Sequence, residues 1–278
     1  MAGRGADSGS AAEPAPHPGQ RGGTRRQGRA PHRLLPTEPR LSEGGWAILN
    51  QMTSPDAPFG SPLQGRAASD AADKPAPGHH PKWLAHLLRP INRQYGTYRG
   101  LLRLGLTHVL LAVGGRTVLT RIEAVAVRRV VFVCQGNICR SPFAEVTARQ
   151  LGMRATSCGL ATGGNVPAFP LAVDTARGFD IDLRGHRARD IEDFRFEPGD
   201  LVLAMELRHL RRLRPVLVGK PVQVSLLGLW APQPRPHLHD PHKLSVEYFQ
   251  TCFRVMTASV QGLALRLRDA PVCRGDRG

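Results

Sequence analysis

The stretch Val130–Glu145, "VVFVCQGNICRSPFAE", decides how the sequence folds, because an apolar run ends there in a cysteine and a short polar loop. Residues 128–134 are mostly β-branched and apolar, which is typical of a strand buried on both faces of a sheet. Ser141, Pro142 and Glu145 then provide the N-cap, the first-position proline and the first-turn acid of a helix. We therefore predict a strand, a tight loop and a helix in direct succession.

The same alternation of strands and helices continues to residue 268. Three more apolar runs predict strands, and the segments between them carry apolar residues at helical spacing. The expected strands are 128–134, 154–159, 200–205 and 221–227, and the expected helices are 141–152, 170–181, 206–215 and 244–268. We expect an α/β domain over residues 128–268, a four-stranded parallel sheet with helices on both faces. Its ligand site would lie at the carboxyl ends of the strands.

Two segments precede this domain and a short one follows it. Residues 1–82 are rich in Pro, Gly, Ala and Arg and show no sustained period, so we predict that they are disordered. Residues 83–127 carry Leu and Val at helical spacing with Arg between them, and they predict a basic amphipathic helical extension interrupted at Pro90 and at Gly114-Gly115. This extension would either pack on the domain or contact a membrane surface or a partner. Residues 269–278 are expected to form a flexible tail.

The composition limits the possible partners and compartment. The net charge of +16 at pH 7 favours anionic partners such as phosphorylated groups. Aromatic residues make up only 5% of the chain and do not interleave with basic runs, so no nucleic-acid partner is expected. The first twenty residues lack the apolar core of a secretion signal, and the five cysteines are an odd number. We therefore expect a cytoplasmic protein with reduced thiols.

The loop at residues 134–141, "CQGNICRS", has the composition of an anion site beside a nucleophile. Gly136 and Asn137 tolerate left-handed backbone, so successive loop amides could point inward at the start of the helix. Arg140 offers a planar fork that can bind two phosphate oxygens. The same positive field would favour the thiolate of Cys134. The loop predicts phosphoryl transfer through a covalent cysteinyl-phosphate.

These residues resemble the low-molecular-weight protein tyrosine phosphatase family, whose loop reads V-C-x-G-N-x-C-R-S-P after the first strand. Further segments resemble the family in the same order. They are "SCGLATGGNVPAFPLAV" (157–173), "GFDIDLRGHRARDI" (178–191), "DLVLAME" (200–206) and "DPHKLSVEYFQ" (240–250). The resemblance covers about residues 129–267. It implies hydrolysis of a phosphotyrosine protein or a small aryl phosphate, with no cofactor and no metal.

The resemblance also implies roles for individual residues. Cys134 would be the nucleophile, Arg140 would bind the phosphate and its transition state, and Asp240 would be the general acid and later the base. The local sequence also supports an acid role for Asp240, because an aspartate followed by a rigid proline in a loop before a helix could supply a proton to a leaving phenolate. Within the loop, Asn137 would hold its shape and Ser141 would donate a hydrogen bond to the thiolate. The full phosphate-binding loop would be Gln135, Gly136, Asn137, Ile138, Cys139 and Ser141.

Two features of the loop and its rim leave alternatives open. Cys139 would either trap an oxidised Cys134 as a reversible disulfide, as the resemblance implies, or be a small packing residue. Phosphotyrosine specialists of the family carry rim aromatics where this chain has "TGGNVPAF" (162–169) and "DPHK" (240–243). The departure predicts a weak or different specificity among aryl phosphates. Phe169 would be a partial substitute or a core residue.

Other readings of the sequence compete with a phosphatase. His237, His239 and His242 surround Asp240 and suggest a metal site, but we expect a solvated loop there, and solvated positions for His186 and His209. An arsenate reductase would need further cysteines in a later segment, and the chain has none between residues 159 and 251. A catalytically idle phosphate-binding regulatory module would need neither the nucleophile nor the acid.

Overall fold

The computed structural model describes residues 82–269, with only the backbone for 82–87, 114–116 and 118. These residues all belong to one compact unit of the chain, Glu38–Gly278. The predicted disorder of residues 1–82 and the predicted flexible tail 269–278 lie outside the described part, apart from Lys82 and Asp269.

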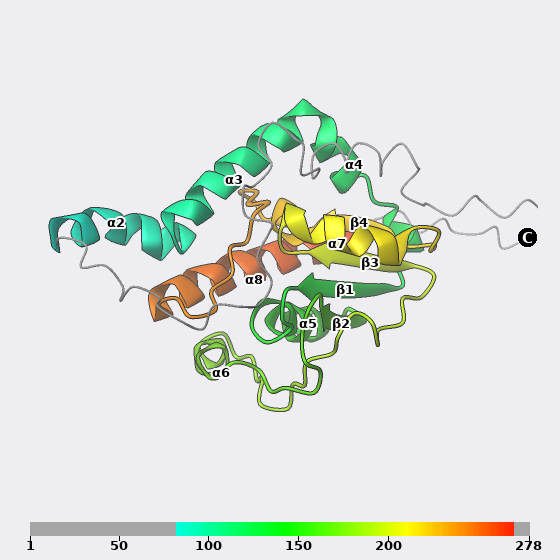
Figure 1. The fold of residues 1–278 in the computed structure, drawn as a ribbon. Coiled ribbons are helices and arrows are strands. Elements are labelled where there is room, and N and C mark those ends of the chain that lie inside the picture. Colours follow the sequence, from blue (N-terminus) through cyan, green and yellow to red (C-terminus); the bar gives the residue numbers. More distant parts are fainter. Residues whose placement is uncertain (1–81, 270–278) are drawn as a thin grey trace, which may run out of the picture. The chain divides into compact units, whose positions relative to one another are not determined.

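The centre of the domain is a sheet of four parallel strands, as predicted (Figure 1). The strands are β1 (Arg129–Cys134), β2 (Ala155–Gly159), β3 (Asp200–Ala204) and β4 (Gln223–Leu226), in the order β2-β1-β3-β4. β1 is an inner strand, and its last residue, Cys134, pairs with Gly159 of β2. The loop that follows β1 therefore starts at the middle of the sheet's carboxyl edge, where parallel α/β sheets place their ligands.

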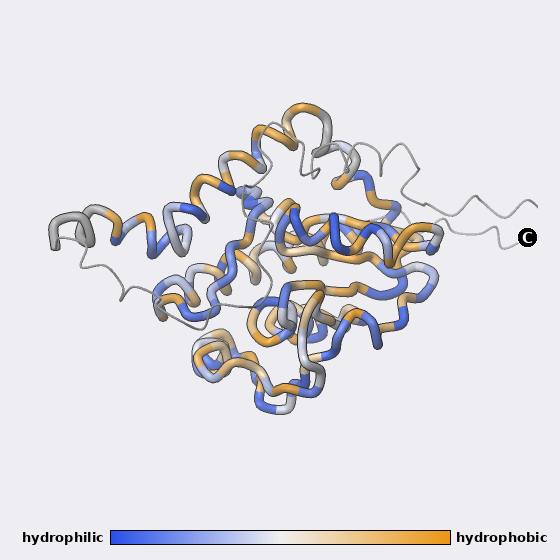
Figure 2. Tube along the Cα trace, in the orientation of Figure 1, coloured by the Kyte–Doolittle hydropathy of each residue, from blue (hydrophilic) through white to orange (hydrophobic). Residues whose placement is uncertain are grey.

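Helices cover both faces of the sheet, which confirms the predicted α/β class. Figure 2 shows apolar strands and a helix α7 (Leu207–Leu217) that alternates between hydrophobic and hydrophilic residues. On one face, Phe132 shares a core with α5 (Arg140–Gln150), α6 (Pro170–Arg177) and α8 (Val246–Arg268). On the other face, Val131 and Val133 share a core with the inward side of α7. Because both faces are covered, every strand residue except the half-buried Arg129 is buried, including the polar residues of β2 and β4.

The predicted helical extension is present and packs on the domain. It comprises α2 (Lys82–Tyr95), α3 (Tyr98–Leu110), the π-helical turn η1 (Leu111–Gly115), α4 (Arg116–Thr120) and the 3-10 turn η2 (Ala124–Ala126). α2 contacts α8 (Figure 1), and Leu111 and Leu119 are buried in the core on the α7 face of the sheet. Within residues 82–269, no helix has both the length and the apolar character needed to cross a bilayer.

Several predicted boundaries were wrong, each for a local reason. The predicted interruption at Pro90 does not occur, because exposed Pro90 lies inside α2 and the chain turns instead at Gly96, whose φ is +79°. The helix after the phosphate-binding loop begins at Arg140, with Cys139 and not Ser141 at its N-cap. α7 continues past Pro215, since Leu217 is buried and holds the last turn on the sheet.

Candidate active site

Asn137 gives the loop between β1 and α5 its shape. It adopts a φ of 52°, a left-handed conformation that asparagine tolerates. Its amide nitrogen donates to the hydroxyls of Ser141 and Ser157, both at 2.8 Å, and its amide oxygen accepts from the backbone N–H of Arg189 at 2.9 Å. Its own carbonyl lies 2.7 Å from Nε2 of His186, so that histidine is half-buried and not solvated as expected. One side chain thus ties the loop to three other parts of the chain.

The sulfur of Cys134 lies inside this loop. Sγ accepts a hydrogen bond from the backbone N–H of Asn137 at 3.2 Å and lies 3.0 Å from Oγ of Ser141. Ser141 therefore contacts the sulfur and does not cap the helix. Donors that point at a sulfur stabilise its thiolate form, as does the start of a helix. The geometry suits a cysteine that acts as a nucleophile.

Arg140 is fully buried and is fixed by three acceptors. Nη1 donates to Oε1 of Glu206 at 2.6 Å and to the carbonyl of Leu238 at 2.7 Å, and Nη2 donates to Oδ2 of Asp240 at 2.6 Å. Burial opposes the charge of the guanidinium, but the carboxylates of Asp240 and Glu206 outweigh it and raise the pKa of Arg140. The cation of the loop is thereby joined directly to the predicted acid.

Glu206 was not predicted as a site residue. It follows β3, is completely buried, and also accepts from Nε of Arg208 at 2.7 Å. Burial raises the pKa of this carboxyl, but Arg140 and the other neighbouring groups lower it well below its usual value. A signal was available, because an acid directly after a strand that neighbours β1 lies at the sheet edge where the loop lies. Glu206 provides a permanent counter-charge behind Arg140.

Two buried histidines flank Glu206. Nε2 of His209 and Nδ1 of His237 each lie 3.7 Å from a carboxylate oxygen of Glu206. The expectation that His209 is solvated was wrong, because it lies on the inward side of α7 and is 1% exposed. His237 is also buried, so its loop is solvated only in part. Burial lowers the pKa of His209 to about 3 and that of His237 to about 4, so both are neutral at neutral pH.

Asp240 lies beside the phosphate-binding loop, in the segment between the 3-10 turn η3 (Leu227–Trp230) and α8. Its side chain is 31% exposed, and Oδ1 accepts from the backbone N–H of His242 at 3.2 Å. It is thus held near the loop and is open to solvent, as a residue that exchanges protons must be. In the described part of the chain, no group of three or more His, Cys, Asp or Glu side chains is arranged to hold a metal ion.

Comparison with known proteins identifies the family. The model of the family described as "Low molecular weight phosphotyrosine protein phosphatase" matches residues 129–271. The chain belongs to this family. The protein-tyrosine-phosphatase Etp of Escherichia coli K12 is 30% identical over 140 residues, which are 50% of this chain and 93% of Etp. Wzb of the same strain is 33% identical over 148 residues, 51% of this chain and 97% of Wzb.

A solved structure with similarity to this chain is the Erwinia amylovora tyrosine phosphatase amsI. It is 26% identical, with a TM-score of 0.45, over 50% of this chain and 93% of amsI. The predicted family is confirmed by the family match and the two relatives, and with it the enzyme class, a cysteine-dependent phosphoric monoester hydrolase. The helices of the extension end at Ala126 and lie outside the residues matched to the phosphatase family.

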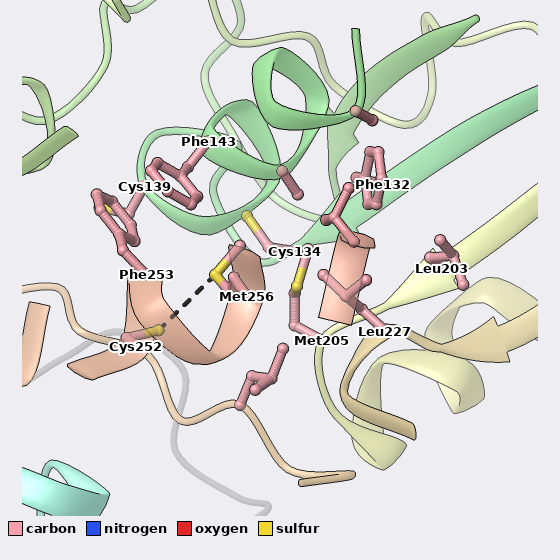
Figure 3. Close-up of a cluster of buried hydrophobic side chains, with 14 of the residues drawn as sticks. Phe132, Cys134, Cys139, Phe143, Leu203, Met205, Leu227, Cys252, Phe253 and Met256 are labelled. Carbon is pink, nitrogen blue, oxygen red and sulfur yellow. Dashed lines mark hydrogen bonds between the residues drawn. The ribbon is translucent and has the colours of Figure 1, made fainter. Parts of the chain in front are cut away.

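Cys139, the second thiol of the phosphatase loop, is buried among apolar side chains. Figure 3 shows it with Cys134 beside Phe143, Phe253 and Met256, which belong to the same buried cluster. Burial raises the pKa of the Cys139 thiol, so it is protonated at neutral pH. A protonated, enclosed thiol reacts slowly, and a disulfide with Cys134 stays a prediction.

The rim beside the phosphatase loop carries an aromatic pair. The rings of Phe169 and His242 pack edge to face, with their centroids 4.6 Å apart. The backbone N–H of Phe169 donates to the carbonyl of Ile138 at 2.9 Å, which fixes Phe169 next to the loop. Gln135, on the loop itself, accepts from Nη1 of Arg212 at 3.2 Å. An aromatic edge is therefore present, and it is formed by Phe169 and His242, one from each of the two rim segments 162–169 and 240–243.

Proposed function

We propose that residues 128–268 form a protein-tyrosine phosphatase that hydrolyses phosphotyrosine or similar aryl phosphate monoesters through a cysteinyl-phosphate. The observation that carries the proposal is the meeting of nucleophile, cation and acid at one loop. Ser141 lies 3.0 Å from the sulfur of Cys134, and Arg140 next to it donates to Asp240 at 2.6 Å. An idle phosphate-binding module would have no use for an acid at this position.

The first step transfers the phosphoryl group to the enzyme. The thiolate of Cys134 attacks phosphorus, so an S–P bond forms as the P–O bond to the aryl group breaks. Asp240 gives its proton to the departing phenolate oxygen. The loop N–H groups and the guanidinium of Arg140 hold the phosphoryl oxygens, where charge is spread in the transition state. Glu206 and Leu238 fix the guanidinium for this task through their bonds to Nη1.

The second step returns the thiolate. Water attacks the phosphorus of the cysteinyl-phosphate, the carboxylate of Asp240 takes a proton from that water, and the S–P bond breaks. The Ser141 hydroxyl, 3.0 Å from the sulfur, stabilises the leaving thiolate. Inorganic phosphate and the protonated Asp240 remain, and release of phosphate completes the cycle. Every proton is moved by groups of this chain or by water.

Hydrolysis of p-nitrophenyl phosphate and phenyl phosphate tests the proposal. Cys134→Ser is expected to abolish turnover, and an acid quench of the wild type during turnover should trap phosphate on the peptide that contains Cys134. Asp240→Asn should lose far more activity on phenyl phosphate than on p-nitrophenyl phosphate, since p-nitrophenolate leaves readily without a proton. Full activity of Cys134→Ser would overturn the mechanism. Phosphate binding without any turnover by the wild type would favour the idle module.

A further inference from the structure

The helical extension contacts the loop that carries Asp240. The end of α2, the turn after it and the first residues of α3, together residues 94–100, are called the buttress here. The loop at residues 235–240 is called the acid loop. One polar contact joins Thr97 to His239, with Oγ1 lying 3.3 Å from Nε2. His239 directly precedes Asp240 in the chain.

Thr97 itself is fixed by the start of α3. It is the N-cap of that helix, and its Oγ1 accepts from the backbone N–H of Gly100 at 3.0 Å. N-caps of this kind contribute about 1 kcal/mol to helix stability. The hydroxyl of Thr97 therefore contacts both the start of α3 and His239, the residue before Asp240.

Two glycines let the backbone of the buttress lie directly on His239. A Cβ on Gly96 would lie 2.7 Å from the ring of Tyr248 and 2.8 Å from the ring of His239, and φ of Gly96 is +79°. A Cβ on Gly100 would lie 3.1 Å from the His239 ring. Gly105, further along α3, is exposed and has nothing within 4 Å of its position for a Cβ. The close approach is thus confined to the end of the helix that meets the acid loop.

A second group of contacts binds the start of the acid loop. Nη1 of Arg235 donates to the carbonyl of Gln94 at 3.1 Å, and Nη2 donates to its side-chain oxygen at 3.2 Å. The same guanidinium lies 5.2 Å from the centre of the Tyr95 ring. Contacts of this type are individually modest at an exposed site, but they act on the same loop from the same side.

The domain also holds the acid loop. The hydroxyl of Tyr248 donates to the carbonyl of His239 at 3.1 Å, and Arg140 donates to the carbonyl of Leu238. A small cavity lined by Leu104, His237 and Cys252, among others, borders this contact, so the loop is not closely packed throughout. The position of His239, and with it that of Asp240, therefore depends on the domain and on the buttress together.

We propose that the buttress is a positioning element of the active site, which holds Asp240 for proton transfer through His239. The proposal rests on the proposed function, in which Asp240 is the acid. The buttress lies outside residues 129–271 that match the phosphatase family. Proton transfer in this chain would thus depend on a segment that the family domain does not contain.

The test compares kcat/KM on phenyl phosphate, whose leaving group needs a proton, with kcat/KM on p-nitrophenyl phosphate. Gly96→Ala and Thr97→Val are expected to lower the value for phenyl phosphate about tenfold and that for p-nitrophenyl phosphate less than about threefold, as for partial loss of general acid catalysis. Thr97→Ser keeps the hydroxyl, and Gly105→Ala changes the same helix away from the acid loop. Both should stay within about twofold of the wild type on both substrates.

A double mutant separates positioning from general damage. If the buttress acts through Asp240, then Thr97→Val should have no further effect in an Asp240→Asn background. An equal fall on both substrates, no fall on either, or a full effect of Thr97→Val without Asp240 would each overturn the proposal. If Asp240→Asn itself treats the two substrates alike, the acid role in the proposed function fails. If Asp240→Asn affects phenyl phosphate more than p-nitrophenyl phosphate and the buttress variants do not, the acid role stands and only the positioning role of the buttress fails.

Discussion

Glu206 is a buried charge whose removal should affect both stability and catalysis. Glu206→Gln would leave Arg140 buried with one carboxylate fewer, and breaking a buried pair of this kind costs about 3–5 kcal/mol. We expect the free energy of unfolding, measured by urea denaturation, to fall by about 3 kcal/mol. We also expect a lower kcat/KM, because the guanidinium of Arg140 is less well fixed. Arg208→Ala is the matched control, since Arg208 is 52% exposed and its bond to Glu206 should be worth less than about 1 kcal/mol. Equal effects of the two variants would contradict this account of Glu206.

His209 should make the folded protein sensitive to acid. Burial lowers its pKa to about 3 in the folded protein, whereas an ordinary histidine has a pKa of about 6.5. Between these values the unfolded chain binds a proton that the folded protein does not, so stability is complete above about pH 6.5 and falls as the pH drops toward 3. In urea unfolding, His209→Gln should lessen this fall by up to about 1.4 kcal/mol per pH unit. A pH dependence of His209→Gln equal to that of the wild type would contradict this account of His209.

Phe169 tests whether the aromatic pair at the rim contributes to substrate binding. Phe169→Ala removes one ring of the pair with His242. We expect KM for aryl phosphates to rise about threefold to tenfold, which corresponds to about 0.5–1.5 kcal/mol for an aromatic contact. Competitive inhibition by inorganic phosphate should hardly change, because phosphate does not reach the rim. If inhibition by inorganic phosphate became weaker to the same extent, Phe169 would support the phosphate-binding loop and would not bind the aryl group.

At the scale of elements, α5 and α8 pack together through a stacked pair of phenylalanine rings. Phe143 and Phe253 are completely buried and stack with centroids 3.9 Å apart. Phe253→Ala should lower the free energy of unfolding by about 3–5 kcal/mol, the usual effect of removing a buried ring. Leu265→Ala, at a 54% exposed position of the same helix, should change it by less than about 0.5 kcal/mol. Thermal or urea unfolding of both variants checks the prediction, and a small effect of Phe253→Ala would contradict it.

The elements of the domain could be predicted because their residues act locally. β1 is apolar on both faces, and the loop after it carries glycine, asparagine and arginine in a spacing that only an anion site explains well. The burial of Glu206, His209 and His237 could not be predicted in the same way. This burial arises where three distant segments meet, whereas glutamate is mostly exposed in proteins and histidine is buried in some and exposed in others. The turn of the extension at Gly96 was missed because Pro90 is the stronger local signal for a helix end.

At the scale of the whole molecule, charge should assist the encounter with substrate. The chain carries a net charge of +16 at pH 7, and aryl phosphates are anions. Raising the salt concentration from about 0.01 M to about 0.1 M shortens the screening length from about 30 Å to about 10 Å. We expect kcat/KM to fall by about twofold to tenfold over this range, with little change in kcat at saturating substrate. A kcat/KM independent of salt would contradict such steering.

The burial of Leu111 and Leu119 in the core on the α7 face bears on how the enzyme should be produced. These two side chains are 3% and 0% exposed, and they come from helices that precede the residues matched to the family. A recombinant fragment that starts at residue 129 would leave their partners facing water as an apolar patch, and patches of this kind promote aggregation. Poor solubility of such a fragment would follow from the missing helices, and expression from residue 82 onward would avoid it.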